Sequence, residues 1–199
     1  KNIVIDEAHI VVDWGASFRV DYQCLEAWRK KLVLTNPSIR TILLSATFES
    51  KCVYVLKKLF SDGEHWIEVR CDALRHEPRY ILLKEKSYKL KEEKIIELVQ
   101  KMPHPMIIYV ARPDDAGRIK GLLADNGINN VYTYTGITNR DQREQLLKDW
   151  KADRFEIMVA TSAFGVGVDK PDIRTVLHLY IPQNPNAYYQ ELGRGGRDQ

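Results

Sequence analysis

Two adjacent carboxylates, Asp6 and Glu7, directly follow the short apolar run Ile3–Ile5. Such a run is typical of a strand, which we expect to be buried on both faces and to end at the acids. A carboxylate at a strand end can hold Mg²⁺ through water molecules, which this ion prefers to keep. A second carboxylate can orient or deprotonate the water that attacks a phosphate. Taken alone, the pair is more typical of solvated acids, and His9 gains meaning only from these neighbours.

A loop that mixes aromatic and basic residues follows the acids. Trp14, Phe18, Arg19 and Tyr22 lie within nine residues, and Gly15 gives the backbone conformational freedom. Aromatic rings stack on nucleobases, and arginine pairs with phosphates or stacks as a cation. The alternative is a loop whose aromatic rings pack into the core, and the residue types leave both interpretations open.

A second polar cluster follows an apolar run that ends at Ala160. It offers two hydroxyls, two glycines through which backbone amides can approach a ligand, and an acid, in the order Thr161, Ser162, Gly165, Gly167 and Asp169. A plain strand–turn–strand connection would also need the two glycines for its geometry. It would not account equally well for the hydroxyls and the acid.

The segment Tyr188–Gln199 carries two arginines, Arg194 and Arg197, that are three residues apart and separated by glycines. This spacing places both on one side of a helix or turn. Guanidinium groups stabilise the charge that builds up on a transferred phosphoryl group. The alternative is a pair of solvated arginines near a helix end. A phosphate-binding loop of the form G-x-x-x-x-G-K-[ST] is absent, because none of the eleven glycines precedes a lysine.

The composition limits the class of protein. The chain has 199 residues, of which 44% are hydrophobic and 29% charged, as in a soluble globular protein. No apolar run approaches the roughly 20 residues that span a membrane, and no N-terminal signal segment is visible. Three widely spaced cysteines fit reduced thiols better than a disulfide framework or a zinc site. The net charge of +3 does not by itself indicate nucleic acid.

Short β-branched runs alternate with helical patterns along the chain. We expect strands at 3–5, 41–44, 79–83, 106–110, 131–134, 156–160 and 175–180. We expect helices at 21–34 (with Leu25, Trp28 and Leu32 as its apolar stripe), 51–60, 91–101, 114–125, 139–150 and from about 186. The patterns lapse around 72–78, which predicts a boundary between domains. This alternation predicts an α/β fold with parallel sheets, whose ligands lie at the carboxyl ends of the strands.

Taken together, these stretches resemble superfamily 2 helicases, and most closely the RecQ family of DNA helicases. The resemblance covers nearly the whole chain and is carried by VIDEAH (4–9), DWGASFRVDY (13–22), LLSAT (43–47), MIIYVARPDDAGRIKGLLADNGI (106–128) and the long stretch from TGITNRDQ to GRGGRDQ (135–199). In the family these look like the second ATPase motif, the aromatic-rich loop that couples single-stranded DNA to ATP hydrolysis, and motifs III to VI.

The resemblance implies RecA-like parallel sheets flanked by helices, with ATP and Mg²⁺ between two domains. It implies the later half of a first RecA-like domain at 1–75 and most of a second at 76–199. For catalysis it implies Asp6 as the Mg²⁺ ligand through water, Glu7 as the base, and Gln190, Arg194 and Arg197 reaching across the cleft, with Arg197 as the arginine finger. It implies that His9, Ser45 and Thr47 couple the nucleotide to DNA. It implies DNA contacts by Trp14, Phe18, Arg19, Tyr22 and Thr161. Gly165 and Asp169 are implied to contact the nucleotide or the DNA backbone.

Some residues depart from the family pattern. The family usually has Gly-His-Asp-Phe-Arg-Pro in the aromatic loop, whereas residues 15–20 read Gly-Ala-Ser-Phe-Arg-Val. Coupling is therefore expected to be weaker or differently tuned. The phosphate-binding segment that such helicases place upstream is missing, so we expect a fragment that alone neither hydrolyses ATP nor unwinds DNA.

The function expected of the parent protein is ATP-dependent, 3′ to 5′ unwinding of DNA, with the direction implied by the resemblance only. Two alternatives are a translocase that does not separate strands and a non-catalytic DNA-binding or scaffold subunit. The expected partner is single-stranded or partly duplex DNA, with RNA less favoured, and protein partners in a repair or defence complex are compatible. The expected location is the bacterial cytoplasm or the eukaryotic nucleus.

Overall fold

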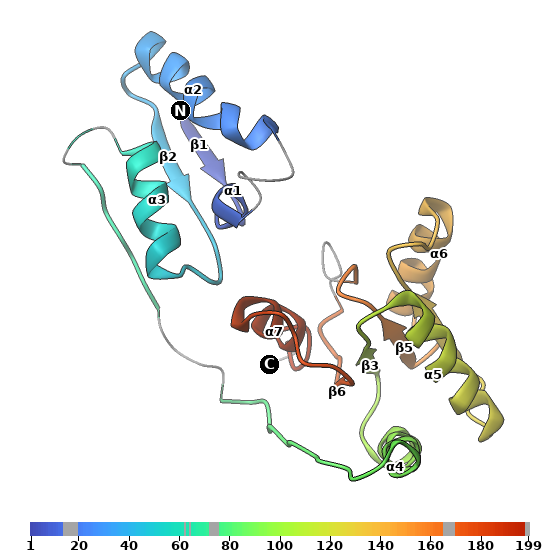
Figure 1. Ribbon diagram of the computed structural model, residues 1–199. Coiled ribbons are helices and arrows are strands. Elements are labelled where there is room, and N and C mark those ends of the chain that lie inside the picture. Colours follow the sequence, from blue (N-terminus) through green and yellow to red (C-terminus); the bar gives the residue numbers. More distant parts are fainter. Residues whose placement is uncertain (14–19, 62, 64, 72–75, 165–169, 198–199) are drawn as a thin grey trace. The chain divides into compact units, whose positions relative to one another are not determined.

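A computed structural model describes residues 1–13, 20–61, 63, 65–71, 76–164 and 170–197 (Figure 1). The chain forms two compact units, Lys1–Ala73 and Leu74–Gln199, called unit 1 and unit 2 below. The division between them falls inside the range 72–78, where the sequence patterns lapse. In the part of the chain that the structure describes, no helix is long and apolar enough to cross a membrane.

Unit 1 is built on two parallel strands. Its elements are β1 (Asn2–Ile5), α1 (Ile10–Asp13), α2 (Val20–Thr35), β2 (Arg40–Leu43) and α3 (Ser50–Phe60). The strand register pairs Ile5 with Leu43, so both strands end at the same edge of the sheet. Helices α1 and α3 pack against one face of the strands. The buried core residues there are Ala8, Val11, Cys52, Leu56 and Phe60.

Two expectations for unit 1 are wrong in detail. Strand β1 is not buried on both faces, because Val4 and its neighbour Ile42 are 57% and 41% exposed on the face opposite the core. In α2 the predicted stripe residue Trp28 is 51% exposed, and Arg29 takes the inward position instead. The Arg29 guanidinium is accommodated there because its Nε donates to Thr41 Oγ1 at 2.7 Å.

Unit 2 is a parallel four-stranded sheet with the order β4-β5-β3-β6. Its elements are α4 (Tyr88–Lys101), β3 (Met106–Tyr109), α5 (Pro113–Asp125), β4 (Val131–Tyr134), α6 (Arg140–Lys151), β5 (Ile157–Ala160), β6 (Thr175–His178) and α7 (Pro185–Leu192). The α/β class with parallel sheets flanked by helices is therefore confirmed.

Helices cover both faces of this sheet because successive side chains of a strand point to opposite sides. In β3, Met106 and Ile108 join the core formed with α4 and α5. Ile107 and Tyr109 join the opposite core, which contains Trp150 of α6. All four strand residues are fully buried, so β3 lies at the centre of the packed core of unit 2.

The predicted strand at 79–83 does not form. These residues run outside any sheet that the structure describes, and Ile81 and Leu82 are 69% and 97% exposed. The β-branched and aromatic composition favours an extended backbone, but a strand also requires a hydrogen-bonded neighbour.

Candidate functional site

The turn after β1 presents the acid pair. Asp6 follows the last strand residue, and its Oδ1 accepts a hydrogen bond from the backbone N–H of Glu7 at 2.9 Å. Glu7 has φ +50°, in the left-handed region that side-chain-bearing residues rarely adopt. Strain of this kind persists where surrounding structure enforces it, and it is common at functional sites. The residue type does not predict this conformation, since glutamate is not among the residues enriched in the left-handed region.

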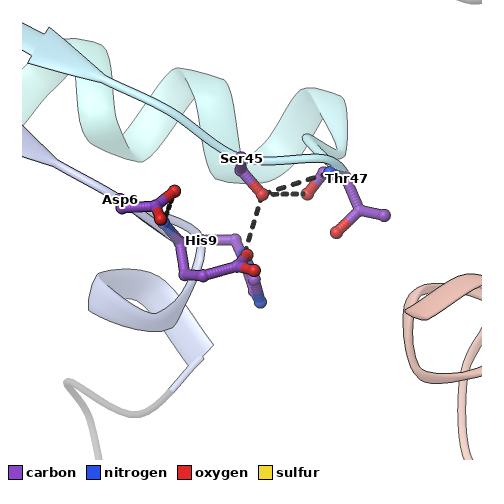
Figure 2. Close-up of polar contacts among 5 residues, drawn as sticks. Asp6, His9, Ser45 and Thr47 are labelled. Atoms are coloured by element: carbon purple, nitrogen blue, oxygen red, sulfur yellow. Dashed lines mark hydrogen bonds and ion pairs between the residues drawn. The ribbon is translucent and has the colours of Figure 1, made fainter. Parts of the chain in front are cut away.

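His9 joins this turn to the residues that follow β2. Its ring is buried, with Nδ1 2.8 Å from Ser45 Oγ and 3.4 Å from Glu7 Oε2. Ser45 Oγ also accepts from the Thr47 backbone N–H at 3.1 Å and lies 3.2 Å from the Thr47 carbonyl oxygen. All these contacts are satisfied when Nδ1 carries the proton, because the Ser45 hydroxyl is then free to donate to the carbonyl. Figure 2 shows this network.

Two oxygens of this cluster remain available to a ligand. Glu7 Oε2 and Thr47 Oγ1 are buried and make no hydrogen bond among the described residues, although Glu7 Oε2 lies 3.4 Å from His9 Nδ1. Buried polar atoms are rarely left unsatisfied, so the Thr47 hydroxyl is suited to a bound water or phosphate and the Glu7 carboxylate oxygen to a hydrogen-bond donor such as water. Carboxylate oxygens also suit Mg²⁺, which takes one or two protein carboxylates and keeps waters and phosphates as its other ligands. The carboxylates present therefore fit a Mg²⁺ ion that keeps its other ligands as water or phosphate.

In unit 2, Thr161 follows β5 at the carboxyl edge of the sheet. The residue is 6% exposed, its N–H donates to the Tyr134 carbonyl at 3.2 Å, and its own carbonyl accepts from Phe164 N–H at 2.9 Å. The Phe164 carbonyl in turn accepts from the Tyr109 hydroxyl at 2.9 Å. These bonds hold the backbone that leads into residues 165–169.

The arginine segment follows α7, which begins where the Asn184 side chain accepts from Ala187 N–H at 2.8 Å. Beyond the helix, Gly196 adopts φ +60° and donates to the Ile173 carbonyl at 2.8 Å. The Arg197 N–H donates to the Pro171 carbonyl at 2.9 Å, and its Nε donates to the Gly193 carbonyl at 2.7 Å. The backbone that carries both arginines is thus anchored to the segment preceding β6.

The two arginines interact electrostatically with Tyr109, a buried residue of unit 2. Burial raises the pKa of the Tyr109 hydroxyl, and the Glu191 carboxylate raises it further, whereas Arg194 and Arg197 lower it. The two guanidinium groups therefore lie within electrostatic reach of Tyr109, at the end of β3. Gln190 is in α7, one residue before Glu191.

The structure brings one set of the predicted residues together in unit 1 and places others in unit 2. Asp6, Glu7, His9, Ser45 and Thr47 meet in unit 1, and Thr161, Gln190, Arg194 and Arg197 belong to unit 2. Trp14, Phe18, Arg19, Gly165 and Asp169 lie outside the described residues, and Tyr22 is in α2 but its side chain is not described. Sequence reasoning missed the buried contacts of Tyr109, His178, Tyr180 and Glu191, which no motif spacing marks.

Comparison with known proteins gives one family match, to the helicase conserved C-terminal domain, over residues 90–199. The chain is 32% identical over 206 residues to the RecQ-like DNA helicase blm-1 of Caenorhabditis elegans, covering 98% of this chain and 19% of that protein. It is 32% identical over 202 residues to the probable ATP-dependent DNA helicase RecS of Bacillus subtilis (strain 168), covering 98% and 38%. The chain thus spans well under half the length of these relatives.

Among solved structures, Saccharomyces cerevisiae Dbp5 bound to RNA and ADP BeF3 matches all of this chain and 50% of that chain, with a TM-score of 0.76 and 23% identity. At this identity the match shows the fold alone. The fold is that of RecA-like helicase domains.

Proposed function

We propose, on the premise that the chain belongs to the helicase conserved C-terminal domain family and is RecQ-like, that the full-length protein carrying it is an ATP-dependent DNA helicase. Residues 1–75 and 76–199 would be parts of two RecA-like domains that bind ATP between them. The protein would act on single-stranded or partly duplex DNA inside the cell, moving 3′ to 5′. RNA is the less favoured substrate, because the sequence relatives are named as DNA helicases.

The observation that carries this proposal is the bond between His9 and Ser45. It connects the acid turn after β1 to the hydroxyl turn after β2 within one buried network. In the proposed mechanism, a change at one turn would be transmitted to the other through these two hydrogen bonds. In an ATPase that responds to DNA, such a network would connect the hydrolytic acid to a second contact surface.

Each residue set has a role in this proposal. ATP would supply the reactive phosphoryl group, and Asp6 would hold Mg²⁺ through water bound to the metal. Glu7 would accept the proton of the attacking water, and Arg197, aided by Arg194 and Gln190, would stabilise the charge that develops on the phosphate. Trp14, Phe18, Arg19, Tyr22, Thr161, Gly165 and Asp169 would contact DNA or the nucleotide, through backbone-directed contacts that are largely independent of sequence.

The test is ATP hydrolysis by the full-length protein with and without single-stranded DNA, followed by strand displacement on substrates with 3′ or 5′ tails. We expect hydrolysis to depend on DNA and displacement to require a 3′ tail. Hydrolysis without displacement would instead indicate a translocase. Absence of hydrolysis under every condition would contradict the proposal and favour a non-catalytic DNA-binding subunit.

The His9→Ala variant probes the coupling specifically. Loss of a buried hydrogen bond costs about 1 kcal/mol or somewhat more, so we expect the DNA-stimulated rate to fall about tenfold. The basal rate without DNA should change less, because Asp6 and Glu7 remain in place. The matched control is His65→Ala, an exposed histidine of the same unit. Equal loss of the basal and stimulated rates would contradict a coupling role.

A further inference from the structure

A buried carboxylate lies in α7 immediately before the arginine segment. Glu191 is 5% exposed, and both of its oxygens accept hydrogen bonds from residues at the end of β6. Oε2 lies 2.9 Å from His178 Nε2, and Oε1 accepts from the Tyr180 hydroxyl at 2.6 Å. Burying a carboxylate is costly unless it is well paired, and an apolar residue is often cheaper at such a site. Its presence therefore calls for an explanation beyond packing.

The histidine that pairs with Glu191 is itself held between aromatic rings. The His178 ring stacks on Tyr109 at 5.3 Å between centroids with 19° between planes, and it lies 5.2 Å from the Tyr188 ring. Tyr109 donates its hydroxyl to the Phe164 carbonyl. A continuous chain of contacts thus runs from Phe164, after β5, through β3 and β6 to Glu191 in α7.

The arginine segment continues directly from Glu191. The Arg194 N–H donates to the Glu191 carbonyl at 3.3 Å, and the Gly195 N–H donates to the Leu192 carbonyl at 3.1 Å. A rotation or shift of α7 at Glu191 would therefore move the backbone of Arg194 and of the residues after it. Catalytic groups tolerate little displacement, since an error of about 1 Å can cost about a hundredfold in rate.

We propose that Glu191 is a positioning residue, which fixes α7 to β6 so that Arg194 and Arg197 are held ready for the phosphate; this rests on the proposed function above. Its two bonds define both the depth and the rotation of the helix, which an apolar contact would define less sharply. The partners are suited to the task, because burial and Glu191 raise the pKa of the Tyr180 hydroxyl and keep it a donor. Buried polar networks of this kind, when fully satisfied, favour a single geometry.

The test uses the full-length protein and compares kcat with KM for DNA-stimulated ATP hydrolysis. For Glu191→Ala we expect kcat to fall at least about tenfold and KM for ATP to change less than about threefold. Glu191→Gln should restore most of the rate, because its amide oxygen accepts from Tyr180 and its NH₂ donates to an unprotonated His178 Nε2. The control is Glu156→Ala, which removes the exposed pair of Glu156 with His104 in the same unit.

A double variant separates positioning from general structural support. If Glu191 acts through the arginines, Glu191→Ala added to Arg197→Ala should lower kcat less than about twofold further. Losses that multiply in the double variant would overturn the inference. Should Glu191→Ala fail to fold, Tyr180→Phe removes one of the two bonds and should lower kcat about fivefold, again with KM little changed.

The remaining outcomes distinguish this inference from the proposed function. A wild-type protein that is stimulated by DNA and inactivated by Arg197→Ala, but whose Glu191→Ala and Tyr180→Phe variants match the Glu156→Ala control, would overturn the positioning role alone. A wild-type protein that hydrolyses no ATP would overturn the proposed function, and the inference with it.

Discussion

Replacing Arg197 with alanine in the full-length protein is expected to lower DNA-stimulated ATP turnover by about 10³-fold or more, with KM for ATP little changed. The charge on a transferred phosphoryl group is largest in the transition state, so a guanidinium that contacts it there affects kcat more than binding. Steady-state hydrolysis over a range of ATP concentrations measures both constants.

The local structure makes this substitution interpretable. The Arg197 backbone is held by Pro171, and its neighbour Gly196 by Ile173, so the segment keeps anchors that do not involve the side chain. The side chain itself is exposed, and its Nε donates to the Gly193 carbonyl at 2.7 Å. Truncation should therefore remove the charge without disturbing the core.

Two further variants sharpen the result. Arg197→Lys keeps the charge but lacks the planar fork, and it should recover only a small part of the rate. Arg154→Ala is the control, because Arg154 is an exposed arginine of the same unit whose partner is Asp149 at 2.6 Å. If Arg197→Ala retained turnover within about threefold of this control, Arg194 would be the better candidate, and Arg194→Ala would then show the large loss.

Much of unit 2 follows from its sequence. Strand 131–134 has the predicted bounds, and α6 begins one residue later than predicted because Asn139 is its cap, accepting from Gln142 N–H at 2.8 Å. The strands that are buried on both faces, β3 and β5, consist almost wholly of apolar residues and are easily recognised. Local sequence patterns are therefore enough to predict a strand whose two faces are both buried.

The errors come from partners that a local pattern does not contain. Residues 79–83 have strand composition without a neighbouring strand, and Arg29 is buried because Thr41, on another element, accepts its hydrogen bond. The four-residue helix α1 is too short to show a period of 3.6 residues. The first two cases depend on tertiary contacts between segments far apart in the chain, and the third depends on the length of the helix.

In the candidate site, too, some features follow from local sequence rules and others depend on contacts between distant residues. That Asp6 and Ser45 would share a sheet edge follows from the rule that parallel strands end together, and the pairing of Ile5 with Leu43 places them so. The sequence does not predict the bond between His9 and Ser45, which are 36 residues apart. It also does not predict the bonds of Glu191 with His178 and Tyr180, which lie 13 and 11 residues away. These contacts depend on side-chain geometry. No spacing rule encodes such contacts.

The Glu7→Gln variant is expected to lower ATP turnover by about 10²- to 10⁴-fold while ATP binding persists. Glutamine has nearly the same shape and can adopt the same backbone conformation, but its amide cannot accept the proton of the attacking water. Binding should be retained because Asp6, the proposed ligand of the metal-bound water, is unchanged. Turnover and nucleotide affinity, measured on the same preparation with and without DNA, distinguish the two effects.

The control for this variant is Glu68→Gln, which removes a carboxylate of unit 1 whose partner, Arg70 at 3.1 Å, lies outside the acid cluster. It should leave turnover and affinity near those of the wild type. If Glu7→Gln kept turnover within about threefold of the control, the catalytic base would be another group. The contact of Glu7 Oε2 with His9 Nδ1, at 3.4 Å, would then point to a purely coupling role for Glu7, and Asp6→Asn, rather than Glu7→Gln, would be the variant that abolishes hydrolysis.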